Sequence, residues 1–325
     1  MNQTKMKDRQ FLGMTRETFF KKYGIIFILL LMVGIMLVVS PTFRTYNNVL
    51  SIMQSVAVNG CLALGMVFVI TAGGIDLSIG SQLALTSVVI GCAFAANAPI
   101  PVAIIASIAM CTAFGFINGL LVSRLKLFPF VVTLATQLVI RGAAYIISDG
   151  KASSITNKSF RTIGMGKVGD VIPVCIFIFL GLAVIAFILL HCTKFGRFVY
   201  AVGGNINAAI ASGIKVKWVQ TFTYAWMGVC AGVAGIILTS RINAAQPNIG
   251  SGYETDAIAA CVIGGTSFAG GISTIPGTII GIIIIGVIYN GMNLLQVNSY
   301  YQMALKGILI ILSVVLDNYL NKRRG

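Results

Sequence analysis

Hydrophobic residues along this chain form long runs that shorter polar segments separate. Four runs carry no formal charge, and they lie at 24–40, 58–74, 79–122 and 171–190. A helix needs roughly 20 apolar residues to cross about 30 Å of hydrocarbon, so runs of this length can span a bilayer. A soluble protein could bury one such run in its core, but not the whole series. The pattern predicts an all-α, polytopic membrane protein.

About ten transmembrane helices can be placed along the chain, as a single transmembrane domain over residues 1–325. The segment 43–57 is more polar and is expected to form an interfacial helix before the second span. No small-x-small cleavage site follows the first run, which we therefore interpret as a retained span and not as a signal peptide. The predicted spans are 24–40, 58–74, 79–97, 101–122, 128–147, 171–190, 218–239, 254–269, 275–294 and 301–319.

Composition agrees with a surface that faces lipid. Charged residues make up only 10% of the chain and hydrophobic residues 57%, whereas soluble domains carry about 25% charged residues. The net charge of +15 does not indicate nucleic-acid binding, because the basic residues lie between apolar runs and form no basic helix with interleaved aromatic residues. The seven cysteines include no C-x-x-C pair, so we expect neither a disulfide framework nor a metal site.

The distribution of basic residues predicts the face on which each loop lies. Cytoplasmic loops carry an excess of Lys and Arg, and a cytoplasmic N-terminus places 15 basic residues inside and six outside. With ten spans, the N- and C-termini are both cytoplasmic. The segment 1–22 and the loop 191–217 are then cytoplasmic, and the loop 148–170 is on the outer face. Two further basic residues, Arg141 and Lys306, fall within spans, where they can snorkel or pair.

Glycines with G-x-x-x-G spacing occur in three of the predicted spans. This spacing lets helix backbones approach closely, and we interpret these glycines mainly as helix-packing positions. A short internal echo, Ala-Gly-Gly-Ile, also occurs at 72–75 and 269–272, at the predicted inner end of two spans, but it is too short to define a repeat. The spaced pairs are Gly115/Gly119, Gly228/Gly232 and Gly277/Gly281.

The chain lacks the sequence features of an energy-coupling or catalytic subunit. No Walker A sequence, G-x-x-x-x-G-K-[ST], occurs in it, so it should not bind ATP by itself. Eight acidic residues occur in the whole chain, and they form no proton-relay series. The single histidine, His191, is expected to have a solvated role at the end of a span. We expect neither an enzyme nor a bound cofactor.

Three acidic residues lie at the ends of predicted spans. Asp76, Glu254 and Asp256 each lie near the start of a helix, where a carboxylate accepts backbone N–H groups and suits the helix dipole. Helix capping is therefore the first interpretation for each of them. The alternative is a hinge or gate on a transport pathway, formed by these three carboxylates and by Ser78.

A series of glycine-rich and polar motifs also runs through the chain in a fixed order. As a set, these motifs resemble the permease subunits of ribose-type ABC importers. The motifs are Gly-Gly-Ile-Asp-Leu-Ser-Ile-Gly-Ser at 73–81, Ala-Val-Gly-Gly-Asn at 201–205, Ala-Gln-Pro at 245–247, Gly-Tyr-Glu at 252–254, Asp-Ala-Ile-Ala-Ala at 256–260, Gly-Gly-Thr-Ser at 264–267 and Ser-Tyr-Tyr-Gln-Met at 299–303.

Three positions depart from the pattern of that family. Ile206 stands where an acidic residue is usual after Gly-Gly-Asn. Ser273 and Pro276 replace a glycine and an aliphatic residue in the glycine-rich turn before the ninth predicted span. These departures concern details of the ATPase contact and of that turn.

The resemblance implies partners on both faces of the membrane. Such permeases work as two copies, as a homodimer or a heterodimer, and dock a cytoplasmic ATP-binding cassette subunit. They receive sugar from a periplasmic or lipid-anchored binding protein. The loop 191–217 coincides with the ATPase-coupling segment of the family. Its coupling residues would be Gly203, Gly204 and Asn205 in a turn, then Ala208, Ala209, Ser212 and Gly213 in and after a short helix at 206–212.

The outer loop is a candidate docking surface for the binding protein. Four of its basic residues could meet acidic residues of such a partner, although a solvated loop without a partner is the alternative. The four residues are Lys151, Lys158, Arg161 and Lys167.

We therefore expect the permease subunit of an ATP-driven importer in the bacterial inner membrane. Its substrate would be a monosaccharide, ribose or a similar pentose or hexose, and a partner chain would hydrolyse the ATP. The alternative is a secondary transporter of a small polar solute driven by an ion gradient. That alternative needs ionisable groups inside the membrane, and this chain offers few. A membrane enzyme would need a paired His, Cys or carboxylate site, which the sequence does not offer.

Overall fold

The chain folds into α-helices, in a computed structural model that describes residues 16–322. The first fifteen residues of the predicted segment 1–22 lie outside the described residues. The helices are α1 (Arg16–Val39), η1 (Pro41–Arg44), α2 (Tyr46–Thr71), α3 (Ile79–Ala95), α4 (Ile100–Leu125), α5 (Pro129–Ser148), α6 (Lys158–Met165), α7 (Val174–Phe187), the π-helix η2 (Ile188–Cys192), α8 (Lys194–Gly204), α9 (Ile206–Ala211), α10 (Val216–Ile242), α11 (Tyr253–Ile263), α12 (Ile275–Leu294) and α13 (Ser299–Lys322).

Strands are confined to four two-residue segments. β1 (Ser153–Ser154) pairs with β4 (Ala244–Ala245), and β2 (Lys167–Val168) pairs with β3 (Ile172–Pro173), both antiparallel. The β1–β4 pair joins the loop after α5 to the loop after α10, and the β2–β3 pair joins the segment after α6 to the start of α7. The described chain is therefore all-helical in its architecture, as the hydrophobic pattern predicts.

Six helices in the described part of the chain are long and apolar enough to cross a membrane. They are α2, α4, α5, α10, α12 and the continuous segment of α7 and η2, and three shorter apolar segments lie at 24–39, 79–95 and 299–312. An α-helix is found within each of the ten predicted spans. The prediction of a polytopic, all-helical membrane protein is confirmed at this level.

Two predicted boundaries are wrong. The segment from Tyr46 to 57 is not a separate interfacial helix, because it forms the first half of α2 without a break. The eighth span was expected over 254–269, but α11 ends at Ile263. Gly264 and Gly265 follow, and Gly265 has a φ of 88° that only glycine adopts readily, so the helix cannot continue. Eleven helical residues cover about 16 Å, roughly half of the hydrocarbon thickness.

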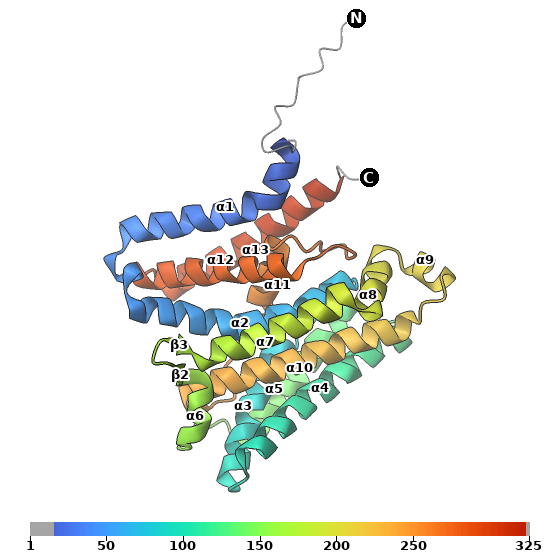
Figure 1. Cartoon of the computed structure of the whole chain (residues 1–325). Helices are drawn as coiled ribbons and strands as arrows, with labels where there is room; N and C mark the ends of the chain where they lie inside the picture. Colours follow the sequence, from blue (N-terminus) through green and yellow to red (C-terminus); the bar gives the residue numbers. More distant parts are fainter. Residues whose placement is uncertain (1–15, 323–325) are drawn as a thin grey trace, which may run out of the picture.

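The centre of the molecule is formed by α2 and α10, which lie between the other helices (Figure 1). Close glycine contacts explain why α10 packs so tightly against α4. A side chain on Gly115 would overlap the carbonyl oxygen of Tyr224, and one on Gly228 would overlap that of Cys111. On α12, a side chain on Gly281 would overlap the carbonyl oxygen of Ala260 in α11. The helix-packing interpretation of the three spaced pairs is confirmed.

Different elements lie at the two ends of the helical bundle (Figure 1). The start of α1, the end of α13, α8 and α9 lie toward the right of the view. The short helix α6 and the β2–β3 hairpin lie at the opposite end. The loops at 191–217 and 148–170 are thus at opposite ends of the molecule, and both are folded rather than extended.

Candidate functional site

Two short helices begin beside one another in the interior of the molecule. A side chain on Gly80, in the first turn of α3, would overlap the carbonyl oxygen of Gly250 and the carboxylate of Glu254. A side chain on Gly250 would in turn overlap the carbonyl oxygen of Gly80. The start of α3 and the segment that leads into α11 are therefore in backbone contact. Because each helix begins here, polar side chains from both are gathered at one place.

The first polar group at this place is built around Ser78. Asp76 accepts hydrogen bonds from the backbone N–H of Ser78 at 2.9 Å and from its hydroxyl at 2.6 Å. The Ser78 oxygen accepts from the amides of Gln82 at 2.9 Å and of Asn118 at 3.0 Å, and these four side chains are buried. Asp76 thus accepts a backbone N–H just before α3, but the N-cap interpretation is wrong for it, because Ser78 occupies the N-cap position and no side chain of the described residues caps that helix end.

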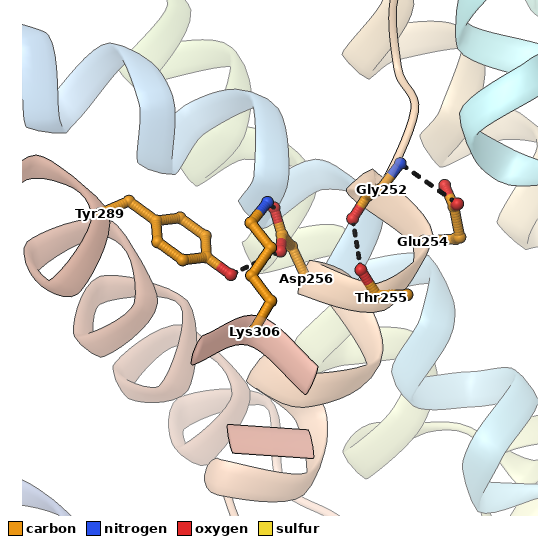
Figure 2. A network of polar contacts seen from close by, with 6 residues as sticks. All are labelled: Gly252, Glu254, Thr255, Asp256, Tyr289 and Lys306. Atoms are coloured by element: carbon orange, nitrogen blue, oxygen red, sulfur yellow. Dashed lines mark hydrogen bonds and ion pairs between the residues drawn. The ribbon is translucent and has the colours of Figure 1, made fainter. Parts of the chain in front are cut away.

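Glu254 lies in the first turn of α11, in the segment that contacts α3. One of its oxygens accepts a hydrogen bond from the backbone N–H of Gly252 at 3.2 Å, so the capping interpretation holds for this residue (Figure 2). The guanidinium of Arg141 on α5 donates to the carbonyl oxygens of Pro247 and Ile249, at 2.8 and 2.7 Å. Arg141 therefore holds the irregular segment that precedes α11, and it does not snorkel.

Asp256 forms a separate cluster with two residues from other helices (Figure 2). Its carboxylate pairs with the Lys306 ammonium of α13 at 3.1 Å and accepts from the Tyr289 hydroxyl of α12 at 2.7 Å. The ammonium also lies 4.4 Å from the centre of the Tyr289 ring, a cation–π distance. The capping interpretation is therefore wrong for Asp256, because its oxygens bind side chains of α12 and α13 and not the start of its own helix.

This arrangement orients polar groups without providing a catalytic constellation. No group of three His, Cys, Asp or Glu residues that could hold a metal ion occurs among the residues the structure describes. One carboxylate oxygen each of Asp76 and Glu254 is buried and has no hydrogen-bond partner within the described chain. Such oxygens can accept hydrogen bonds from hydroxyl groups of a polar solute.

The loop 191–217 folds into α8 and α9. Asn205 caps α9, with its side-chain oxygen accepting from the backbone N–H of Ala208 at 3.0 Å, and Gly213 has a φ of 79° just after the C-cap Ser212. The short helix expected at 206–212 is present. Gly203 and Gly204 do not form the expected turn, because they are the last residues of α8.

The two alanines of α9 lie in different environments. Ala208 is exposed, as are its neighbours Ile206 and Ile210, with 43% and 58% of their surface accessible. Ala209 is only 3% exposed and belongs to the main hydrophobic core. The expectation that both alanines face a partner is therefore wrong for Ala209, because the helix turns its side chain inward.

The outer loop 148–170 presents its four candidate docking residues to solvent. All four are exposed, and they are Lys151, Lys158, Arg161 and Lys167. Lys151 pairs with Asp149 at 2.6 Å, and Lys167 lies over the ring of Tyr46 at 5.3 Å. Behind them, the backbone N–H of Gly164 donates to the Ser240 hydroxyl of α10 at 2.8 Å, which fixes α6 against the helices.

The sequence does not identify the partner of either basic residue within the spans, and it does not predict the contacts of His191. His191 is half-buried in η2, where Nε2 accepts from the backbone N–H of Ile275 at 3.4 Å and Nδ1 lies 3.5 Å from the Tyr200 hydroxyl. The solvated role expected for it is therefore wrong. A signal for the Lys306 pair was present, since an isolated charge inside the membrane is costly and two basic residues there call for acidic or carbonyl partners.

Comparison with known proteins places these features in context. Residues 48–314 match the family described as the branched-chain amino acid transport system / permease component. The chain is 44% identical over 294 residues to a ribose import permease of Bacillus subtilis, with 90% of each chain covered. It is 42% identical over 307 residues to the D-allose transport system permease of Escherichia coli K12, with 94% of each covered.

A third relative is more distant but is also a sugar permease by name. The L-arabinose transport system permease of Escherichia coli K12 is 33% identical over 303 residues, covering 93% of this chain and 92% of that protein. No solved structure matches the chain.

Proposed function

The chain belongs to the family of branched-chain amino acid transport system permease components, and from that premise we propose that it imports a monosaccharide. It is the permease component of an ABC importer, a multi-pass protein of the bacterial inner membrane, and it is not itself catalytic. The substrate assignment rests on one observation. Relatives named for ribose and D-allose are 42–44% identical over nine-tenths or more of the chain.

The family description mentions branched-chain amino acids, which would be a different cargo. The three sugar-permease relatives cover nearly the whole chain, so the sugar assignment is favoured. The buried free oxygens of Asp76 and Glu254 also suit hydroxyl groups better than the aliphatic side chain of an amino acid. Ribose, or a similar pentose or hexose, is the proposed substrate.

The proposed topology has ten crossings with both termini in the cytoplasm. The excess of basic residues on the side of 191–217 supports this orientation. In this arrangement α11, which is about 16 Å long, crosses only part of the bilayer, and its start meets the start of α3 inside the membrane. Half-helices whose N-termini meet near the midplane are a recurring way for transporters to build a pathway.

The proposed pathway passes the point where α3 and α11 begin. Asp76, Ser78 and Glu254 are its candidate gate residues, and the free carboxylate oxygens would accept hydroxyl groups of the passing sugar. Asp256 is assigned a positioning role instead, because Lys306 and Tyr289 already occupy its oxygens.

The partners follow from the type of transporter. ABC importer permeases work with an ATPase and a binding protein; here, a second permease copy, identical or related, is proposed in addition. The exposed residues of the segment 203–213 would couple the chain to the ATPase, and they are Gly204, Asn205, Ala208, Ser212 and Gly213. The exposed apolar surface of α9 supports a contact there, whereas Gly203 and Ala209 face the rest of the molecule and are not proposed to touch the partner. The basic residues Lys151, Lys158, Arg161 and Lys167 would receive the binding protein.

The energy source provides the test of this proposal. We expect the permease, reconstituted in liposomes with its ATPase and binding protein, to accumulate labelled ribose only when ATP is supplied. Uptake should stop when the ATPase is inhibited and continue when the proton gradient is collapsed. Competition with unlabelled D-allose, L-arabinose and leucine then defines the cargo. Uptake that needs no ATP and stops with the gradient would identify a secondary transporter instead.

A further inference from the structure

The last turn of α8 is seated in backbone contact with two other segments. A side chain on Gly203 would overlap the carbonyl oxygen of Thr71, at the end of α2, and would lie 2.6 Å from the backbone nitrogen of Gly271. The N–H of Gly271 itself donates to that Thr71 oxygen at 2.9 Å. Three segments that are distant in sequence therefore meet at one glycine, and none of them can move here without displacing the others.

The loop 264–274 is shaped to fit this contact. Gly270 and Gly271 have φ values of 89° and 74°, which residues with side chains rarely adopt. A side chain on Gly270 would lie 2.8 Å from the carbonyl oxygen of Gly203. The echoed Ala-Gly-Gly-Ile segments at 72–75 and 269–272 thus lie at one place, since Gly271 bonds the residue just before the first of them.

Side-chain hydrogen bonds join the same segments. The Tyr200 hydroxyl of α8 donates to the carbonyl oxygen of Ser273 at 3.0 Å, and the Thr71 hydroxyl donates to the Ser273 hydroxyl at 2.6 Å. His191 of η2 contacts Tyr200 and accepts from the N–H of Ile275, the first residue of α12. A π-helical turn such as η2 often lies at a functional position.

We propose that this contact, the α8 junction, passes movement of α8 and α9 to the membrane-spanning helices α2 and α12. The junction consists of Thr71, His191, Tyr200, Gly203, Gly271 and Ser273. The inference rests on the proposed function, in which an ATPase moves α8 and α9. Loop 264–274 is the connecting element, because it bonds α8 on one side and leads directly into α12 on the other.

The α8 junction is a close contact between backbones with no side chain between them at Gly203, and such a contact suits the transmission of movement. Packed interfaces shift between discrete arrangements and do not compress, so a displacement of α8 at Gly203 must appear at the end of α2 and at the start of α12. Buried side chains also anchor both helices in the core, namely Val199 and Val202 of α8 and Ala209 of α9. Gly203, Tyr200 and Ser273 act as positioning residues, because they contact neither sugar nor ATP in this proposal.

The first test compares two glycines in helices. In the complete complex with ATPase and binding protein, Gly203→Ala is expected to lower the ribose transported per ATP hydrolysed by about fivefold or more, because the added methyl group would overlap the carbonyl oxygen of Thr71 and separate α8 from α2. ATPase co-purification and the KM for ribose uptake should stay unchanged. Gly181→Ala in α7 is the matched control, because a side chain there meets nothing within 4 Å. It should leave the ratio unchanged.

The second test removes one hydroxyl group and keeps the fold. Tyr200→Phe loses the bond to Ser273, whereas the control Tyr46→Phe loses bonds of similar length to the carbonyl oxygens of Asp170 and Val171 at the other end of the molecule. We expect only Tyr200→Phe to lower the ribose-to-ATP ratio. A merely structural role would reduce the amount of folded complex and leave this ratio intact. If Gly203→Ala does not assemble, the tyrosine pair decides alone.

The outcomes separate the junction from the function that it serves. If the wild-type complex moves ribose with ATP and both Gly203→Ala and Tyr200→Phe keep its ratio, the α8 junction is not the transmission route. If the wild-type complex itself moves no sugar with ATP, the proposed function fails first. A lowered ratio in Tyr200→Phe with normal ATPase binding supports the junction.

Discussion

At the scale of single residues, the most informative contact is the ion pair between Lys306 and Asp256. An unpaired charge inside a membrane costs roughly 2.5–3.5 kcal/mol at a helix centre. Here the carboxylate is 4% exposed and the ammonium 29% exposed, and the Tyr289 hydroxyl bonds the carboxylate as well. The pair therefore offsets the desolvation of both charges and connects α13 to α11.

Removing one member of this pair should destabilise the protein more than removing both. We expect Lys306→Met to lower the free energy of unfolding by about 2 kcal/mol, below the usual 3–5 kcal/mol for a buried pair because Lys306 is partly exposed. The double variant Lys306→Met/Asp256→Asn should recover at least half of that loss. Thermal or denaturant unfolding in detergent measures both values.

A surface ion pair provides the matched control. Lys151 and Asp149 are 78% and 82% exposed and pair at 2.6 Å, and such pairs contribute about 0–1 kcal/mol. Lys151→Met should therefore leave unfolding nearly unchanged. Equal losses in Lys306→Met and Lys151→Met would mean that the membrane pair carries no special stability.

At the scale of elements, α9 has one face exposed to solvent and one face packed against the core. Its exposed face carries Ile206, Ala208 and Ile210, and its inner face carries the buried Ala209. A bulky residue at Ala209 would overpack the core and could unfold the loop, so a loss of transport there would have two explanations. Ala208 tests the partner contact without that difficulty.

We expect Ala208→Trp to weaken co-purification of the ATPase at least tenfold and to stop sugar uptake. The exposed site should tolerate the side chain at a cost below about 1 kcal/mol in folding free energy, so membrane insertion and melting temperature should stay near the wild-type values. Pull-down of the ATPase from detergent-solubilised complex measures the effect. Ser154→Trp, exposed in the outer loop, is the control and should retain the ATPase. Normal ATPase binding by Ala208→Trp would move the contact to another loop, with 124–127 next in line.

At the scale of the whole molecule, the proposed orientation of the helices governs every assignment of partners. We expect a membrane-impermeant thiol reagent to label Ser154→Cys in intact cells and Ser212→Cys only after permeabilisation. The background should carry Cys92→Ser and Cys192→Ser, because these two thiols are exposed in the structure. Cysteines placed at Lys5 and Arg324, which lie outside the described residues, should behave like Ser212→Cys. Labelling of these two ends from opposite faces would require an odd number of crossings.

The charge of the outer end gives a second prediction at this scale. Reversing Lys158 and Arg161 to Glu should weaken docking of the binding protein about tenfold at low salt, because steering by exposed charges depends on the Debye length. The difference from wild type should shrink as salt is raised. Binding to the permease in nanodiscs, measured across a salt series, gives both quantities. The control is reversal of Lys215 and Lys217, which are exposed at the other end. Unchanged affinity and salt slope in the first variant would exclude the patch as a docking site.

The sequence by itself determined the class of the protein and the position of most helices. Lipid demands long stretches without charge, and such stretches are a local property that can be read from neighbouring residues. The close packing of the spaced glycines could be predicted for the same reason, since three intervening residues place both on one helix face. The short helix at 206–212 and the hydrogen bonds of Asp76 and Glu254 to backbone N–H groups two residues away are likewise local features.

Only the tertiary structure decided which groups meet. Lys306 is 50 residues from Asp256, and Gly203 lies far along the chain from both Thr71 and Gly271, so no periodicity links them. The early end of α11 at Ile263 and the inward position of Ala209 depend on which neighbouring backbones leave room. Pairing, burial and contact are set by the relative position of helix faces in three dimensions. The hydrophobic pattern, which specifies only that a face is apolar, does not contain that information.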